Sequence, residues 1–240
     1  MSPCAYPTGP PSEVFAPWSD AHDVVERLAC EPIPARWALR STGFLLPCAA
    51  ERIAAWFSGH PVPATPQVRT AYRALEAETR ALFGVVCAGR RAGGLGVRVR
   101  YVDGPDDPYA SASELCAELR EQGTTCLRTI ASTEPHPLLR STEGGPVDQL
   151  RVVHDVFGHA ALGLGFDLQS EYATWLQCRA LFGPLARHAA FTELVGAVTA
   201  FVAAGAPPPL RADLAPSALM DARRPRHDAS TQGPRLRRSA

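Results

Sequence analysis

The sequence contains neither lysine nor asparagine. All 24 of its basic residues are therefore arginine, and they balance 24 acidic residues to a formal net charge of zero. Without lysine the chain cannot form a Schiff base, a phosphate-loop lysine contact or a Ser–Lys dyad, and without asparagine it offers no N-glycosylation acceptor. Lysine and asparagine codons are rich in A and T, so we attribute their absence to a GC-rich genome. The chemistry that remains rests on imidazole, carboxylate and guanidinium groups.

Cysteine pairs and long apolar runs are also missing. The seven cysteines are odd in number, scattered and never spaced as C-x-x-C, which argues against a disulfide framework and against a cysteine zinc knuckle. No apolar run approaches the roughly 18 to 20 residues that cross a bilayer. The first residues form neither a basic nor an apolar leader region. We therefore expect a cytoplasmic protein that is not embedded in a membrane.

Composition shifts divide the chain into three parts. Residues 1–19 are rich in proline, serine and glycine and are expected to form a flexible arm, whereas residues 20–205 carry periodic apolar patterns. Residues 206–240 are expected to be a disordered tail rich in proline and arginine. Within it, residues 221–240 hold six arginines against two aspartates, without an aromatic or glycine-rich pattern. We interpret the tail as solubilising and do not expect nucleic acid as a partner.

The periodic part is predicted to be a single, predominantly helical α+β domain with a minor β-sheet, flanked by disordered termini. Helices are expected near residues 20–30, 49–58, 67–88 and over most of 147–205. Residues 97–102 alternate valine with arginine, as a half-buried strand does, and residues 126–131 form a second strand-like run. A helical pattern over residues 111–122 lies between them. This order predicts a small β-α-β element.

Two histidines are the first indication of chemistry. His154 and His159 lie five residues apart in the run HDVFGH. On an ideal α-helix this spacing turns two side chains about 140° apart, so they meet at one metal ion only if the helix ends or bulges between them. Gly158 permits such an interruption. The spacing differs from the i,i+4 pair of zincin proteases, and Asp155 stands where their catalytic glutamate follows the first histidine.

Two acids follow downstream. Glu193 lies in the run AAFTELVGAV, where an isolated carboxylate is costly to desolvate unless it is paired or binds a cation. Glu171 lies in SEYATWL. Two histidines and one carboxylate form the facial triad of non-heme iron(II) enzymes, which leaves coordination positions open for oxygen and substrate. The same ligand set with one water also suits catalytic zinc.

Two short segments resemble a known family. The run HDVFGH resembles the histidine motif of the pterin-dependent aromatic amino acid hydroxylases, and FTELVG resembles their later segment with the iron-ligand glutamate. The resemblance is confined to residues 150–198 and implies that His154, His159 and Glu193 bind Fe(2+). The pterin-binding segments of that family are not recognised elsewhere, so tetrahydropterin is disfavoured as a cofactor. The wider pattern also resembles small bacterial and phage proteins with an HDxFGH motif, a resemblance that implies no activity.

Further side chains are candidates for the same site. Glu171 is expected as a fourth ligand, as an acceptor for a histidine N–H, as a partner of a substrate amine, or as an exposed surface acid. Asp155 is expected beside the ligands or as a surface charge. His136, between two prolines, either faces the site or caps the following helix. The candidate substrate contacts are Arg151, Tyr172 and Trp175, of which the two aromatic residues are alternatively core.

Together these residues predict a mononuclear non-heme iron(II) oxygenase. It would act with O2 on a small organic substrate, such as an amino acid or an aromatic compound, and Glu171, Asp155 and His136 would assist the reaction. Two alternatives stay open. One is a zinc-dependent hydrolase with the same ligands, in which Glu171 or Asp155 is the general base. The other is a non-catalytic helical interaction module whose histidines are structural.

Overall fold

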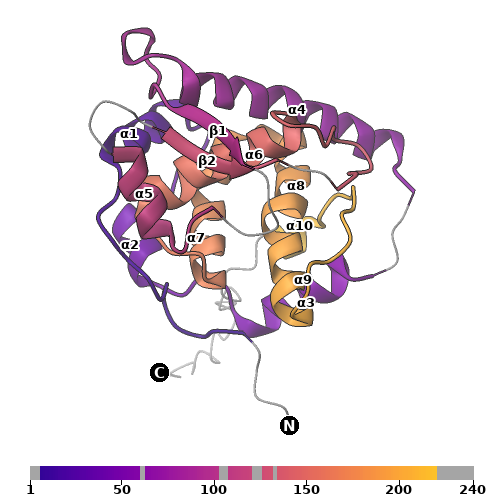
Figure 1. Ribbon diagram of the computed structural model, residues 1–240. Coiled ribbons are helices and arrows are strands. Elements are labelled where there is room, and N and C mark those ends of the chain that lie inside the picture. The colour runs from indigo at the N-terminus through magenta and orange to yellow at the C-terminus, as the bar shows by residue number, and fades with distance from the viewer. Residues whose placement is uncertain (1–5, 60–62, 103–107, 121–125, 132–133, 221–240) are drawn as a thin grey trace, which may run out of the picture.

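The computed structural model describes residues 6–59, 63–102, 108–120, 126–131 and 134–220 (Figure 1). Over these residues the fold is predominantly helical α+β with a two-stranded sheet, as predicted. The α-helices are α1 (Ser19–Leu28), α2 (Arg36–Ser41), α3 (Pro47–Phe57), α4 (Pro66–Cys87), α5 (Ala112–Arg120), α6 (Pro146–His154), α7 (Leu168–Cys178), α8 (Pro184–Phe191), α9 (Ala197–Ala204) and α10 (Ser217–Met220). The strands are β1 (Arg98–Val102) and β2 (Cys126–Ile130), and the π-helical segments η2 (Asp155–Ala160) and η4 (Thr192–Gly196) follow α6 and α8.

Helix α4 crosses the whole molecule (Figure 1). Its start is defined by Thr65, whose side chain accepts a hydrogen bond from the N–H of Val68 at 3.2 Å, and by Pro66 in the first turn. One face of the helix, including Tyr72 and Leu75, is buried, and α6 and α8 pack against the helix. The apolar spacing that predicted a helix over residues 67–88 is therefore the spacing of the buried face.

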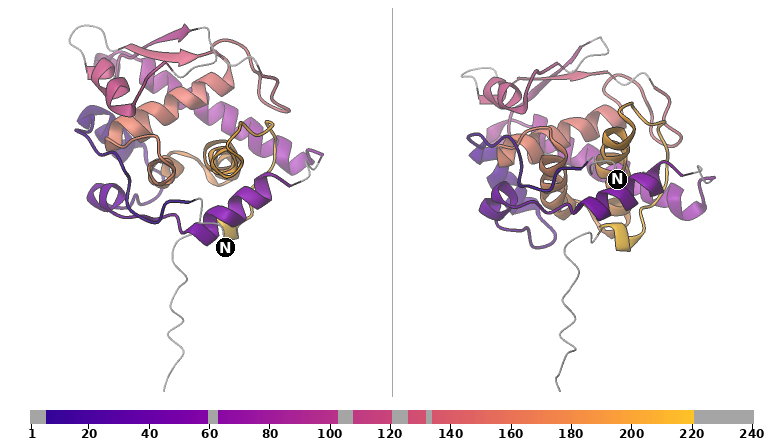
Figure 2. Two further views of the ribbon diagram at one scale, coloured as in Figure 1. Left: turned by 60° about the horizontal axis from the view of Figure 1, so that its bottom comes forward. Right: turned by 90° about the horizontal axis from the view of Figure 1, so that it is seen from below.

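The two strands run parallel, with Arg98 opposite Cys126 and Val102 opposite Ile130. Helix α5 connects them and packs against β2, so the predicted β-α-β element is present. Figure 2 shows the sheet on one side of the molecule, over α6. The sheet thereby covers the helix that ends at His154.

The predicted flexible arm is packed against the domain over residues 6–19. Val14 forms an isolated bridge with Leu164, and the N–H of Phe15 donates to the carbonyl of Gly163 at 3.0 Å. Trp18 is buried. Backbone hydrogen bonds and apolar burial therefore hold this segment in place, whereas residues 1–5 lie outside the described residues.

The first part of the predicted tail, residues 206–220, packs on the domain instead. The guanidinium of Arg211 is buried and donates to the carbonyls of Trp56, Phe57 and Gly59 at the end of α3. It also pairs with Asp213. Arg211 thus takes up carbonyl groups that a helix end leaves without intrahelical partners. The remaining part of the predicted tail, residues 221–240, lies outside the described residues.

Segments α8, η4 and α9 form one continuous helix, Pro184–Ala204, inside the region 147–205 that was predicted to be mostly helical. Its 21 residues include a window of mean hydropathy 1.2, enough by length and composition alone to cross a membrane. Half of that window is buried inside the protein, where α8 packs against α4 and α9 packs against α3. Core helices of water-soluble domains pass the same test.

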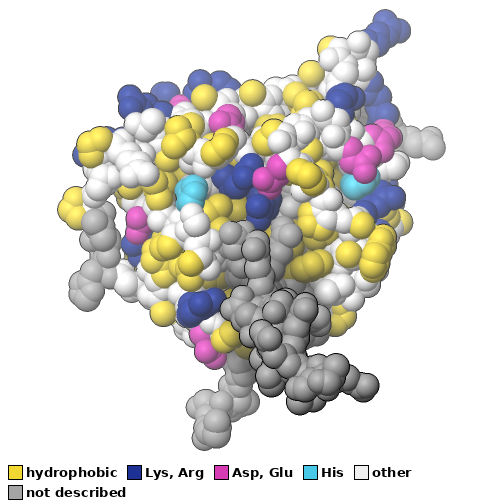
Figure 3. Space-filling view, turned by 180° about the vertical axis from the view of Figure 1, so that it is seen from behind, with side chains coloured by type: hydrophobic (Ala, Val, Ile, Leu, Met, Phe, Trp, Pro, Cys, Tyr) yellow, Lys and Arg dark blue, Asp and Glu magenta, His cyan; other side chains and the backbone are white. Residues whose placement is uncertain are grey.

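The face of the molecule opposite to Figure 1 carries mixed charge. Figure 3 shows arginine side chains there separated by apolar and acidic ones rather than joined into one patch. Such a face matches the balanced composition of the chain. The expectation that nucleic acid is not a partner stays a prediction.

Replacing Arg211 by alanine is expected to lower the free energy of unfolding by about 2 kcal/mol, because it leaves buried carbonyls at the end of α3 without a charged donor. Denaturant unfolding of Arg211→Ala and of Arg69→Ala, a change at an exposed arginine of α4, measures the difference. Equal stability of the two variants would show that the hydrogen bonds of Arg211 to the end of α3 do not stabilise the fold.

Candidate metal centre

A π-helix brings the two histidines of HDVFGH together. Helix α6 ends at His154 and continues without a break as η2, which contains His159. In a π-helix the hydrogen bonds run from residue i to residue i+5, so side chains five apart lie on the same side. This local change of helix type removes the angular separation of an α-helix. Phe157, also in η2, is fully buried and fixes the segment in the core.

The glycine between the histidines allows α7 to approach η2 closely. A Cβ atom on Gly158 would lie 2.9 Å from Cβ of Thr174 and 3.5 Å from Sγ of Cys178, both on α7. The start of α7 is set by Asp167, whose carboxylate accepts hydrogen bonds from the N–H groups of Gln169 and Ser170. The close approach and the defined start together place Glu171, in the first turn of α7, over the two histidines.

The three side chains form one compact cluster, which we call the His/His/Glu cluster: His154, His159 and Glu171. The two Nε2 atoms lie 3.1 Å apart, Nε2 of His154 lies 2.9 Å from Oε2 of Glu171, and Nε2 of His159 lies 3.4 Å from Oε1. Ligand bonds of about 2.1 Å place neighbouring donor atoms roughly 3.0 to 3.4 Å apart in octahedral or tetrahedral coordination. The cluster can therefore hold a metal ion.

The proton positions of the two rings agree with such a site. Nδ1 of His159 lies 3.2 Å from the carbonyl oxygen of Leu164, which only accepts hydrogen bonds. Nδ1 therefore carries the proton, and Nε2 offers its lone pair to the cluster, as in many metal-binding histidines. Within the described residues the buried Nδ1 of His154 has no hydrogen-bond partner. Since electron-pair donors converge from three sides, a cation belongs between them.

The charges of the cluster shift its pKa values strongly. Burial by itself would lower the pKa of His159, but the charge and the hydrogen bonds of Glu171 raise it to about 9. Burial by itself would raise the pKa of Glu171, but the charge of His159 and the hydrogen bonds of both histidines lower it to about 2. Burial raises the pKa of Asp155, against the opposing charges of the two histidines and Arg151. In the absence of metal, the protonated ring of His159 therefore balances the charge of Glu171.

Glu193, which was predicted from the sequence to be a metal ligand, lies outside the His/His/Glu cluster. Its Oε1 accepts a hydrogen bond from the hydroxyl of Tyr72 at 2.5 Å and lies 3.2 Å from Nε2 of His136. The N–H groups of Leu138 and Leu139 both donate to Nδ1 of His136. The neutral ring then carries its proton on Nε2 and donates it to Glu193. His136 is thus a hydrogen-bond donor to an acid and not a member of the cluster.

One pocket joins the cluster to Glu193. It has a volume of about 480 Å³ and combines three carboxylates, two arginines and a largely apolar remainder. The lining residues are Pro108, Tyr109, Leu115, Arg128, Thr129, Arg151, His154, Asp155, His159, Phe166, Glu171, Glu193, Leu194 and Val198. The predicted candidates Arg151 and Asp155 therefore reach the pocket beside the cluster. A pocket of this size admits a small organic molecule.

Two predicted substrate contacts do not reach the pocket. Tyr172 and Trp175 are fully buried, and Trp175 packs edge to face against Phe191 in the core. Both residues follow Glu171 on α7, but the turn of the helix directs them away from the cluster. Of the two readings that the sequence left open for these aromatic residues, the core reading is correct.

The sequence missed several pocket residues. Phe166 packs edge to face against His159 with ring centroids 4.9 Å apart, and Tyr109 and Arg128 come from the β-α-β element. Tyr72 reaches Glu193 from the buried face of α4. Phe166 lies seven residues after His159, directly after the run GLG, so the sequence near the histidine pair could have indicated it. The other three come from distant segments that only folding brings together.

Replacing Gly158 by alanine is expected to weaken metal binding at least roughly tenfold, because the added Cβ pushes α7 and Glu171 away from η2. The matched control is Gly84→Ala on α4, where a Cβ meets nothing within 4 Å and helix propensity favours alanine. Metal titrations of both variants give the comparison. Wild-type affinity in Gly158→Ala would mean that this close approach does not position Glu171.

Metal affinity is expected to rise with pH until the pKa of His159, about 9, is passed. Below that value metal must displace a proton from His159, so affinity gains about tenfold per pH unit, whereas Glu171 is already ionised. Zinc titrations against a competing chelator, from about pH 6 to about pH 9, provide the measurement. A pH-independent affinity would contradict the proton position inferred for the cluster.

Comparisons with protein-family models, with curated proteins and with solved structures found no match for this chain. What the cluster does must therefore be argued from its own geometry and chemistry.

Proposed function

We propose that the protein is a mononuclear non-heme iron(II) oxygenase that acts on a small organic substrate. The observation that carries the proposal is the convergence of His154, His159 and Glu171 at the wall of a pocket of about 480 Å³. Three protein ligands on one side of an iron ion leave the other side open. In this protein that side faces a pocket large enough for O2 and a substrate.

Each part of the pocket has a defined task in this proposal. His154, His159 and Glu171 hold the iron, which supplies the activation of O2. Leu115, Leu194 and the other apolar lining residues keep water from the reacting atoms. Arg151 provides positive charge at the wall, where an anionic group of the substrate would bind, whereas the guanidinium of Arg128 is paired with Glu114 and Glu118.

The proposal assigns Glu193 a different role from the one that the sequence implied. Two donors, Tyr72 and His136, hold its Oε1, whereas no hydrogen bond from the described residues reaches its Oε2. Because Glu193 lines the pocket, Oε2 is available to accept a proton or a hydrogen bond from the substrate. The resemblance of HDVFGH to the hydroxylases supports iron at the two histidines, but the geometry favours Glu171 over Glu193 as the carboxylate ligand.

A zinc-dependent hydrolase is the second candidate. The carboxylate of Glu193, which is hydrogen-bonded in a fixed position beside the cluster, favours it. Hydrolysis needs activation of water, which zinc on the same three ligands supplies, and a nearby general base. Glu193 lines the pocket without belonging to the cluster, so its Oε2 can take up the proton of the attacking water. Asp155 also lines the pocket and is the second candidate for this base.

Substitutions distinguish the proposed metal ligands from Glu193. His154→Ala and Glu171→Ala are expected to lose nearly all bound metal, whereas Glu193→Ala retains the metal and loses turnover. Glu51→Ala, at an exposed position of α3, is the control for loss of a carboxylate. Metal content per chain, measured after anaerobic purification, gives the result. Full occupancy in Glu171→Ala together with an empty Glu193→Ala would overturn the ligand assignment.

The identity of the metal separates the two candidate functions. For the oxygenase we expect iron after anaerobic purification, and an electron paramagnetic resonance signal when nitric oxide is added as a surrogate of O2. Zinc as the purified metal, with no nitric oxide signal after loading with iron(II), would reject the oxygenase and leave the hydrolase.

A further inference from the structure

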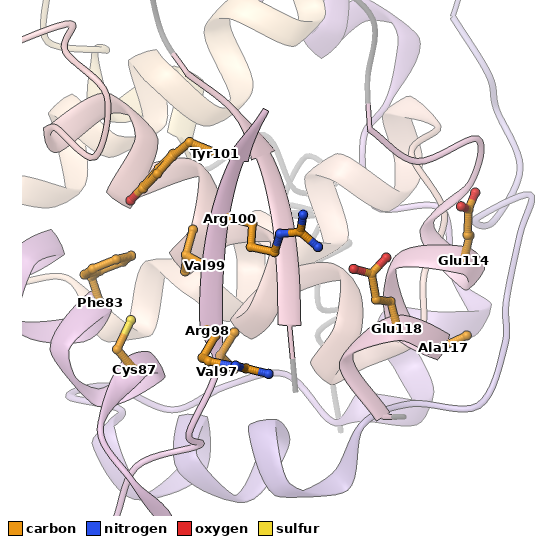
Figure 4. Close-up of a pocket in the computed structure, with 10 residues that line it drawn as sticks. All are labelled: Phe83, Cys87, Val97, Arg98, Val99, Arg100, Tyr101, Glu114, Ala117 and Glu118. Carbon is orange, nitrogen blue, oxygen red and sulfur yellow. The ribbon is translucent and has the colours of Figure 1, made fainter. Parts of the chain in front are cut away.

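A second pocket lies away from the His/His/Glu cluster, along strand β1. It has a volume of about 1160 Å³. Figure 4 shows its lining: the C-terminal part of α4 on one side of β1, the strand itself, and α5 beyond β2. Strand β1 pairs only with β2 within the described residues, so its other edge borders this groove.

Hydrogen bonds at the two ends of β1 show which peptide groups of this strand face the groove. The N–H of Val97 donates to the carbonyl of Val86 on α4, away from β2, whereas the carbonyl of Val102 accepts from Ala131, just after β2. Along a parallel strand, successive residues direct their N–H and C=O groups to alternate sides. The peptide groups of Val99 and Tyr101 therefore point away from β2. No backbone hydrogen bond to them from the groove side is found in the described part of the chain.

The side chains beside this edge differ in character on the two faces of the sheet. On one face Val99, Phe83 and Cys87 form an apolar wall (Figure 4). On the other face Arg98 and Arg100 are exposed, and neither has an ion-pair partner among the described residues. The acids of that face, Glu114 and Glu118, are paired with Arg128 of β2. The groove thus offers unpaired strand edge, apolar surface and unpaired positive charge.

We propose that the free edge of β1 binds an extended segment of a partner protein as a third strand, and that acidic and apolar residues alternate along this segment. Side chains of a strand alternate between the two faces of a sheet. In the added strand the acidic side chains would meet Arg98 and Arg100, and the apolar ones would meet Phe83 and Val99. Backbone hydrogen bonds to Val99 and Tyr101 would supply the pairing, as in other cases of strand addition.

Charge argues against two other occupants of the edge. A second copy paired through β1 would place arginines opposite arginines on one face, and like charges opposite each other destabilise a strand pair. The C-terminal residues 221–240 hold six arginines against two aspartates, so they would bring the same charge to Arg98 and Arg100. An acidic segment is the occupant that the groove complements.

The test uses the full chain and a labelled ten-residue peptide that alternates glutamate with valine. We expect saturable binding by fluorescence anisotropy, slower amide hydrogen exchange at Val99 and Tyr101, and weaker binding at higher salt. A peptide that alternates lysine with valine should bind at least roughly tenfold more weakly. Absence of binding by the glutamate peptide, or equal binding of both peptides, would overturn the proposal.

Two variants test the edge directly. Val99→Pro removes a donor on the groove side and leaves the β1–β2 hydrogen bonds in place, and the double change Arg98→Glu with Arg100→Glu reverses the charge without touching the backbone. Each should weaken binding of the glutamate peptide at least roughly tenfold. The double change Arg69→Glu with Arg73→Glu, at exposed positions of α4, makes the same charge change outside the groove and should bind as the wild type does.

Wild-type affinity in the charge-reversed variant would contradict the proposal even if Val99→Pro fails to fold. Two further outcomes would assign the edge elsewhere. A dimer of the wild-type chain that the charge reversal abolishes would identify a second copy as the occupant. Peptide binding that appears only after residues 221–240 are removed would identify the C-terminal segment.

Discussion

The structure depends on one electrostatic constraint: Glu171 is held among apolar residues with two imidazole nitrogens directed at its carboxylate. The carboxylate and the two ring nitrogens all present lone pairs to one another, so a proton or a metal ion has to lie between them. The surrounding fold serves this arrangement. Asp167 fixes the start of α7, Phe157 fixes η2 in the core, and the N-terminal segment is hydrogen-bonded to the turn that follows η2. Without the two histidines, the largely buried carboxylate of Glu171 would lose the groups that balance its charge.

Both helices that carry the candidate site residues change type where these residues occur. Helix α6 passes into π-helix η2 at the histidine pair, and α8 passes into π-helix η4 at Glu193. A π-helical turn holds its backbone hydrogen bonds less favourably than an α-helical turn, and it is found mostly where function needs a particular side-chain direction. Here each turn directs a polar group into the same pocket. Two helices with different neighbours therefore supply the two halves of one site.

Two of the three pocket carboxylates, Glu171 and Glu193, lie in unlike surroundings, and this difference separates the roles proposed for them. Glu171 faces two histidines, whose charge and hydrogen bonds hold its pKa near 2. Glu193 faces a tyrosine hydroxyl and an imidazole N–H of His136, whose Nδ1 accepts hydrogen bonds from backbone N–H groups. Carboxylates that share a site but differ in environment commonly divide the work of binding and proton transfer. The same division suits an oxygenase or a hydrolase.

Local patterns in the sequence were enough for much of the fold. The buried face of α4, the parallel pair β1 and β2 and the need for an interruption between His154 and His159 all follow from spacing, because side-chain direction within one element depends only on its period. The choice between Glu171 and Glu193 did not follow. It depends on which helix packs within one side-chain length of η2, and on donors from α4 and from the turn at His136 that lie far away in the chain. The sequence by itself therefore indicated the types of candidate ligand, two histidines and a carboxylate. The packing of α7 against Gly158 determined which acid completes the cluster. Sequence could not show this, because a contact between two distant segments leaves no periodic pattern in either segment.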